Sequence, residues 1–481
     1  MLTLFLIILP FIAGVSVLML KNSGYVKKVA LYAVLAELLL SVYVLALFLT
    51  NCHCIFILDI SWIGSIGLRF HIGLEGIGML MVLLTNGLMP LIILSGIKKE
   101  PKRVNIFYAL ILFMQSAFIG VFVSLDAILF YIFWELALVP AYFIVFIWGE
   151  GEQRKITMKF FIYTLFGSLL MLVAFIFINY KTPDHSFQWV DFYFLNLDAN
   201  SQSWLFWCFF IAFAIKMPIF PFHTWQPKTY TTAPTQGTML LSGIMLKMGI
   251  FGAIRWMFPI VPLGVAQWGN IAMVLSIIGI IYASIITLKQ NDLKTFIAWS
   301  SIAHLGLIAA GLFARNFYSW QGVMIQMVAH GINSVGLFFV IDIFEDRFKT
   351  RNISDLGGIK QHSKLIALFF MIILFGSIAL PFTDGFFGEF MMILGIFKYN
   401  YILAAFAGLT IIVSAIYVLT VFRKTMLGES NELTKNAIVL TTNEKIILYV
   451  VAVLVIVLGV YPQPIFNLTS SAVQDILMVM K

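Results

Sequence analysis

The segment SWLFWCFFIAFAIKMPIFPFHTWQP, residues 203–227, contains a lysine inside a long apolar run. Lys216 is followed within five residues by Pro218 and Pro221. A lysine at the centre of a spanning helix costs roughly 2.5–3.5 kcal/mol on insertion scales, so a retained one usually serves a protonation or ion site. Each proline removes a backbone donor, and unwound backbone at membrane depth must pack in protein or line a wet cavity. The segment therefore predicts a broken membrane helix that carries a functional charge.

The composition extends this reading to the whole chain. The 481 residues are 61% hydrophobic and only 11% charged, whereas charged residues make up about 25% of an ordinary soluble protein. Runs of about 20 apolar residues predict an all-α polytopic membrane protein. We expect about fourteen transmembrane helices, near residues 2–20, 28–49, 74–95, 104–123, 126–148, 157–179, 203–227, 235–257, 266–288, 296–313, 319–343, 364–397, 401–422 and 444–461. The first segment has no basic n-region, so it is interpreted as a retained span.

The basic residues predict the orientation. Loops after odd-numbered spans hold about 22 of the 30 lysines and arginines, and the opposite side holds about six. The positive-inside rule then makes the odd loops cytoplasmic and places both termini on the outer side of the membrane. Only Lys216 and Lys247 belong to neither side. The net charge of +8 is explained by this topology, and no nucleic-acid partner is expected.

The sequence offers little for a metal or a cofactor. Cys52 and Cys54 flank His53, but two thiols and one imidazole in adjacent positions make a poor tetrahedral set. No Gly-rich phosphate loop, haem motif or iron–sulfur cysteine set is present. We therefore expect no metal, no cofactor and no redox centre in this chain.

A second interrupted span predicts an internal repeat. Residues 364–397 contain Pro381, Gly385 and Gly388 in an otherwise apolar run. Spans seven and twelve are five apart, and because successive spans alternate in direction, two five-helix units with this offset have opposite topology, as in inverted-repeat transporters. We expect one membrane domain, residues 1–481, with three N-terminal helices in 1–103, a first repeat in 104–257, an inverted second repeat in 266–424, and a last helix with a tail in 425–481.

Ionisable residues recur at similar depth in six of the predicted spans. Such a row is suited to proton transfer. Burial lowers the pKa of a Lys and raises that of a Glu, and pairing of the two residues reverses both shifts. The candidates for proton translocation are Glu135, Lys216, Lys247, His304, His330 and Glu389.

Structural roles remain open for several of these groups. A histidine in a helix bundle is often a packing residue, and a carboxylate can anchor a helix break. Glu37 lies at mid-depth with no motif around it, so packing or a contact with another chain is as plausible as function. Solvation is the expected explanation for four acids near span ends or breaks, Glu75, Asp126, Asp342 and Asp384.

Several motifs together resemble one family, the antiporter-like proton-pumping subunits of respiratory complex I, the NADH:quinone oxidoreductase. They are FYIFWELALVP (130–140), KMPIFPFHTWQP (216–227), APTQGTMLLSGIMLKMG (233–249), NDLKTFIAWSSIAHLGLI (291–308), AHGINSVGLFF (329–339), LPFTDGFFGEFMMILG (380–395) and GVYPQP (459–464). The resemblance extends over essentially the whole chain. Glu389 and a short tail favour the M branch of the family, called chain 4 in mitochondria, over the L and N branches.

The resemblance implies residue roles and partners. Glu135 and Lys216 correspond to the coupling pair, Lys247 to the central relay lysine, and Glu389 to the terminal residue of the output half-channel. The resemblance further implies sister membrane subunits as partners, with flavin, iron–sulfur clusters and quinone in other subunits.

Two other functions share this fold and most of these motifs. One is a subunit of a multisubunit Na⁺/H⁺ antiporter, and the other is a subunit of a membrane-bound hydrogenase. A purely structural membrane scaffold is also conceivable, but six buried ionisable groups argue against it.

Overall fold

The computed structural model describes residues 1–50, 57–64, 67–435 and 438–480. The cluster of Cys52, His53 and Cys54 lies outside the described residues. The long helices are α1 (Leu2–Met19), α2 (Ser23–Thr50), α3 (Gly76–Ser95), α4 (Val104–Val123), α5 (Ala127–Trp148), α6 (Gln153–Lys181), α8 (Ala199–Lys216), α12 (Pro262–Thr287), α13 (Leu293–Phe313), α14 (Phe317–Phe348), α16 (Lys364–Ser377), α17 (Gly385–Tyr399), α18 (Tyr401–Phe422), α19 (Thr442–Val460) and α20 (Gln463–Val479). Short helices are α7 (Trp189–Tyr193), α9 (Gln226–Thr232), α10 (Thr235–Leu240), η2 (Leu241–Met245), α11 (Leu246–Gly252), η3 (Ala253–Met257), η4 (Ile353–Asp355), α15 (Ile359–His362) and η5 (Arg423–Leu427).

The helices confirm a polytopic membrane protein. Among the described residues, twelve helical segments are long and apolar enough to cross a membrane. The two predicted spans outside these twelve are spans seven and twelve, which the structure divides into α8 with α9 and α16 with α17. Both divisions fall at the predicted prolines, where the backbone lacks helical donors.

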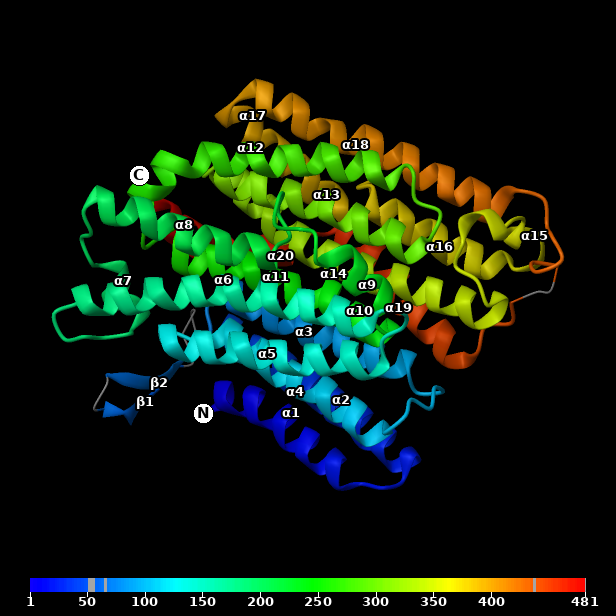
Figure 1. Ribbon diagram of the computed structural model, residues 1–481, viewed down its shortest axis with the longest axis horizontal. Helices are drawn as coiled ribbons and strands as arrows, with labels where there is room; N and C mark the ends of the chain where they lie inside the picture. Colours follow the sequence, from blue (N-terminus) through cyan, green and yellow to red (C-terminus); the bar gives the residue numbers. More distant parts are fainter. Residues whose placement is uncertain (51–56, 65–66, 436–437, 481) are drawn as a thin grey trace.

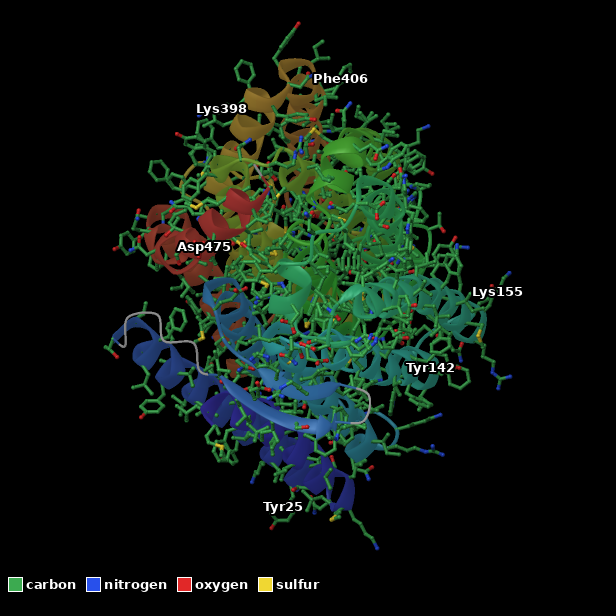
Figure 2. The ribbon with its side chains drawn as sticks, turned by 90° about the vertical axis from the view of Figure 1, so that its left-hand side faces the viewer. Tyr25, Tyr142, Lys155, Lys398, Phe406 and Asp475 are labelled. Carbon is green, nitrogen blue, oxygen red and sulfur yellow. The ribbon has the colours of Figure 1, made fainter. Side chains whose placement is uncertain are left out.

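The helices run side by side along the long axis of the molecule (Figure 1). In the view turned by 90°, the N-terminal helices lie at one edge, marked by Tyr25 on α2, and α18 lies at the opposite edge, marked by Phe406 (Figure 2). Both chain termini lie at the same end of the bundle (Figure 1). α17, the second half of the second broken helix, lies next to α18 at the edge opposite the N-terminal helices (Figure 1).

Burial separates central from peripheral helices. The apolar windows of Thr235–Met257 and of α14 are 100% buried, whereas those of α1, α18 and α19 are each 33% buried. A helix that is hydrophobic all round belongs inside a large bundle or faces lipid. The polar groups of spans eight, ten and eleven consequently lie in the protein interior, and the outer helices present apolar side chains to their surroundings.

A β-hairpin and a C-terminal helix are among the elements that have no counterpart in the predicted spans. The strands β1 (Leu58–Ile63) and β2 (Leu68–Ile72) form an antiparallel pair, with Asp59 opposite His71 and an irregular register between Ser61 and Ile63. The predicted tail instead forms the helix α20, which packs against α3 and α14. Alternation of apolar and polar residues at helical spacing explains this packing, because α20 buries only one face.

Candidate proton-translocation site

The first broken helix ends at the lysine that the sequence singled out. α8 stops at Lys216, and regular helix resumes only in α9. Lys159 of α6 donates from Nζ to the Thr224 carbonyl at 3.1 Å, and the Trp225 indole N–H donates to the Ile215 carbonyl at 2.9 Å. These bonds satisfy backbone carbonyls that an interrupted helix leaves without their usual donors.

Lys216 itself is buried beside this break. Its residue is 1% exposed, and Nζ makes no hydrogen bond to the described residues. The ammonium lies 4.9 Å from the ring centre of Trp134, and an indole face attracts a cation through its quadrupole. Glu135, the next residue of α5, is half-buried, interacts electrostatically with Lys216 and has an unpartnered Oε1. The predicted pair is therefore within electrostatic range, but its ion pair is not closed in this structure.

Span eight passes directly over the end of α8. A Cβ added at Gly249 would lie 2.7 Å from Met217 Cγ and 3.1 Å from Lys216 Cβ. Only a residue without a side chain fits between these atoms, so the two segments approach each other closely. Lys216 and Lys247 are thus carried by elements in direct contact.

Lys247 lies in α11, between two π-helical turns. The residue is fully buried. Its ammonium donates to the Ser242 carbonyl at 2.6 Å and lies 2.8 Å from Nδ1 of His330. Ser242 belongs to the π turn η2, in which the hydrogen-bond ladder is shifted by one residue, a distortion frequent at functional sites. This turn supplies a backbone acceptor to a lysine in the protein interior.

The two histidines continue the polar contacts towards span twelve. His330 Nε2 lies 2.8 Å from Ser301 Oγ. When the Lys247 ammonium donates to Nδ1, Nε2 carries the ring proton and donates to this hydroxyl. His304 Nδ1 lies 3.0 Å from Oε1 of Glu389, the acid after the second break. Two hydrogen-bonded groups therefore face each other, one centred on His330 and one on His304.

A small cavity lies between these two groups. Its volume is about 30 Å³, and its polar lining residues are Ser300, Ser301, His304, Gln326, His330, Asn333, Ser334 and Ser377. Roughly 10–15 Å³ is enough for one water when two or more polar partners are present. The cavity is thus large enough for about two waters that would connect the histidines.

The structure brings together four of the six predicted residues. Lys247, His330, His304 and Glu389 form two hydrogen-bonded pairs on either side of the cavity. Lys216 and Glu135 lie next to this group, with α11 in contact with the end of α8.

Sequence reasoning missed three polar residues that line this path. Gln326 donates to Glu389 Oε1 at 3.4 Å, Asn333 donates to Asp384 Oδ1 at 3.0 Å, and Ser301 contacts His330. Gln326 and Asn333 stand four residues before and three residues after His330, so these three residues of α14 share one helix face. This spacing of polar residues in an apolar helix could have identified Gln326 and Asn333 from the sequence.

The expectation that boundary acids are solvated was wrong for three of them. Asp126, Asp342 and Asp384 are 1%, 4% and 1% exposed. Asp126 accepts hydrogen bonds from the backbone N–H groups of Ile128 and Leu129 and caps α5, as the N-cap position favours. Neighbouring helices bury these positions, and the sequence of one span alone does not show which helices pack against it.

Asp342 belongs to an ion-pair group at one end of the bundle. Lys99 Nζ lies 2.5 Å from Asp342 Oδ1 and 3.4 Å from Asp346 Oδ2, and Thr235 donates to Asp342 at 2.5 Å. Burial lowers the pKa of Lys99, but the two carboxylates outweigh it, so the net pKa is raised. An open cavity of about 500 Å³ next to the start of α10 is lined by Lys99, Asp342 and Asp346. Lys99 is partly exposed there, whereas Asp342 stays buried.

A second buried polar network lies among the N-terminal helices. Asn86 donates to Glu37 Oε1 at 3.3 Å, and Gln115 donates to Asn86 Oδ1 at 2.8 Å. Glu37 is 0% exposed. The contact with Asn86 matches packing within the chain, one of the interpretations left open for Glu37, while Oε2 of Glu37 has no hydrogen-bond partner among the described residues.

Two interrupted helices beside a row of buried ionisable groups define a class, the polytopic membrane proteins that move small cations through a helix bundle. The family described as "NADH:quinone oxidoreductase/Mrp antiporter, TM" matches residues 124–414. Relatives named NADH-quinone oxidoreductase subunit M are similar over most of their length. The Rickettsia typhi protein is 36% identical over 98% of this chain and 97% of its own, and the Rhodobacter capsulatus protein is 39% identical over 93% and 89%. The chain belongs to this NADH:quinone oxidoreductase/Mrp antiporter family.

Solved structures agree with this assignment. A chain of "Respiratory complex I from Thermus thermophilus with bound NADH" has a TM-score of 0.92 and 26% identity, covering 100% of both chains. A chain of the Mrp complex from Dietzia sp. DQ12-45-1b has a TM-score of 0.88 and 16% identity, covering 100% of this chain and 98% of its own. The second match supports the fold alone.

Proposed function

We propose that this chain is a proton-translocating membrane subunit of an NADH:quinone oxidoreductase, equivalent to its subunit M relatives. The observation that carries the proposal is the sequence of contacts from Lys247 through His330 and a small polar cavity to His304 and Glu389. Titratable groups at such depth are costly and rarely retained without a transport role. The relatives are named as subunit M of NADH-quinone oxidoreductase, which supports NADH oxidation by quinone as the energy source. The cation in this proposal is a proton.

The mechanism begins at the open pair. Closing Glu135 onto Lys216 to about 4 Å at an effective dielectric near 20 would stabilise the charged pair by about 4 kcal/mol. Opening it releases that stabilisation and makes the Lys216 proton easier to transfer. Moving one charge against 100 mV takes about 2.3 kcal/mol. The energy change on opening or closing this pair is therefore large enough to drive the movement of one proton. The proton would then pass to Lys247, across the cavity and to Glu389.

Several finer features belong to this proposal. The chain would hold no redox centre, and flavin, iron–sulfur clusters and quinone would act in other subunits. It would lie in a bacterial inner membrane with both termini on the outer side and sister membrane subunits beside it. The two broken helices support an arrangement of two inverted five-helix repeats, residues 104–257 and 266–424.

An alternative is a subunit of a multisubunit Na⁺/H⁺ antiporter or of a membrane-bound hydrogenase. The fold permits it, since the Mrp chain and a chain of an archaeal membrane-bound sulfane sulfur reductase, with a TM-score of 0.87, are both similar. Their identities of 16% and 22% are below the 36–39% of the subunit M relatives. Sequence similarity therefore favours the oxidoreductase.

The test uses the assembled complex in sealed vesicles. Lys216→Ala and Glu135→Ala should abolish most proton uptake driven by NADH oxidation while leaving assembly largely intact, because each removes one half of the coupling pair. Proton uptake is followed with a pH-sensitive dye, and assembly by native electrophoresis. Full pumping in both variants would refute the pairing, and pumping that depends on Na⁺ instead of NADH would favour the antiporter.

A further inference from the structure

We propose that Asp384, in the break of span twelve, is a second proton-binding carboxylate of the relay. The inference rests on the proposed function, because it places another acid on the same path. Sequence reasoning assigned Asp384 to solvent, yet the residue is 1% exposed. A carboxylate buried at membrane depth needs a specific reason to be there.

A capping role does not supply that reason. Asp384 precedes α17 at its N-cap position, where a carboxylate usually accepts a hydrogen bond from the second or third helical N–H. Here the side chain makes no such bond. Its Oδ1 instead accepts a hydrogen bond from Asn333 of α14 at 3.0 Å. The side chain is therefore directed towards the helix that also carries His330.

Asp384 and Asn333 each retain an unused acceptor. Asp384 Oδ2 and Asn333 Oδ1 are buried and make no hydrogen bond to the described residues. A Cβ added at Gly376 would lie 2.5 Å from Asn333 Oδ1 and 2.9 Å from Asp384 Oδ1. Gly376 thus gives these oxygens the room that any larger residue would occupy. Two free acceptors side by side need donors, and a proton on the carboxyl or a water molecule would supply one.

Asn333, the partner of Asp384, borders the cavity of the relay. Asn333 and Gly376 both line the cavity of about 30 Å³ between the two histidines. On α14, Gln326 contacts Glu389 and Asn333 contacts Asp384. Seven residues separate these two positions, about 10 Å along the helix. The two acids therefore meet the path at different depths, with His330 between them.

The charge of Asp384 favours a proton as the cation bound at this site. Among the described ion pairs, none includes Asp384, whereas Glu389 has His304 at 3.0 Å. Among the described residues, the groups that face an ionised Asp384 carboxylate are the Asn333 amide and the backbone N–H groups at the start of α17, so no full positive charge is paired with it. A proton is the smallest cation that can compensate it, and it reaches the site through the cavity without an ion-sized opening. Asp384 would then accept the proton from His330 through cavity water and return it when the break rearranges.

The decisive variant is Asp384→Asn, which keeps the shape and the acceptor for Asn333 but cannot bind a proton as a carboxyl does. In the assembled complex in vesicles, we expect the initial rate of proton uptake during NADH oxidation to fall about 100-fold or more, the scale of a lost acid–base group. Infrared difference spectra between oxidised and NADH-reduced complex should lose a protonated-carboxyl band. Asp198→Asn, at the exposed N-cap of α8, is the matched control and should change neither readout.

A swap separates proton binding from packing. The double variant Asp384→Asn with Asn333→Asp exchanges the carboxyl and the amide across the same hydrogen bond, so it should recover most of the pumping and a carboxyl band. If Asp384→Asn does not assemble, Asn333→Ser replaces the amide donor with a shorter hydroxyl but keeps the acid, and it must shift the carboxyl band. Wild-type pumping with an unchanged spectrum in Asp384→Asn, or an unshifted band in Asn333→Ser, overturns the inference. The proposed function fails separately, if pumping by the unmodified complex depends on Na⁺ instead of NADH.

Discussion

The contact between α8 and span eight predicts that Gly249→Ala impairs pumping although it replaces no ionisable residue. The added Cβ would lie 2.7 Å from Met217 Cγ and 3.1 Å from the Lys216 Cβ, whereas ordinary contact begins near 3.4 Å. The segments must therefore separate by several tenths of an ångström, and overpacking of this kind costs about 1–3 kcal/mol. This separation would lengthen the distance between Lys216 and Lys247.

The magnitude follows from the same strain. If about 1–3 kcal/mol is added to the barrier for proton transfer between the two lysines, the rate falls about 5- to 150-fold, since 1.36 kcal/mol is a factor of ten. The measurement is the initial rate of proton uptake per NADH oxidised, in vesicles with matched amounts of assembled complex. We expect the complex with Gly249→Ala to oxidise NADH but to take up fewer protons per NADH than the wild type.

A matched control is available in α18. Gly408 is also helical, but a Cβ there would meet nothing within 4 Å, so Gly408→Ala should gain the usual helix propensity of alanine and leave pumping unchanged. Equal pumping in Gly249→Ala and Gly408→Ala would show that the approach of the two segments does not control transfer. Loss of assembly in Gly249→Ala alone would indicate a packing role only.

Two further predictions concern charge. Lys247→Arg keeps a cation next to Ser242 and His330, but a guanidinium does not release its proton, so pumping should be lost while the complex assembles; wild-type proton uptake would remove Lys247 from the relay. Lys99→Met leaves Asp342 without its cation and should destabilise the complex in thermal unfolding. The loss of stability should be smaller than the roughly 3–5 kcal/mol that breaking a fully buried ion pair costs, because the Lys99 side chain is 35% exposed. Adding Asp342→Asn should restore much of the stability, and equal melting of the single variant and wild type would mean that this pair contributes nothing measurable.

Hydropathy and helix-breaking residues were sufficient to predict most of the fold. The predicted span 235–257 coincides with Thr235–Met257, and the span at 104–123 with α4. Both breaks fall where proline removes a backbone donor. The hairpin of β1 and β2 and the helix α20 were not predicted, because short strands and an amphipathic tail do not stand out against apolar spans of about 20 residues.

The candidate site was predicted less completely. Depth along each span identified Lys247, His304, His330 and Glu389, since charges in apolar helices are conspicuous in a sequence. Which of these groups touch depends on helix rotation and on neighbours, and spacing within one helix does not contain that information. The burial of Asp384 was missed for the same reason, because its cover comes from α14 and α16.

The π turn before Lys247 has a consequence for mutational surveys of this protein. One of the two acceptors of the lysine ammonium is the carbonyl of Ser242, part of the main chain. Exchanging the side chain at that position leaves the carbonyl in place, so a scan of alanine variants would record an essential group as dispensable. A shift in main-chain register would reveal it: deleting one residue within 241–245 would favour regular α-helix, withdraw the carbonyl and rotate every residue upstream by about 100°. Genetic tolerance to substitution and intolerance to deletion in these five residues would then occur together.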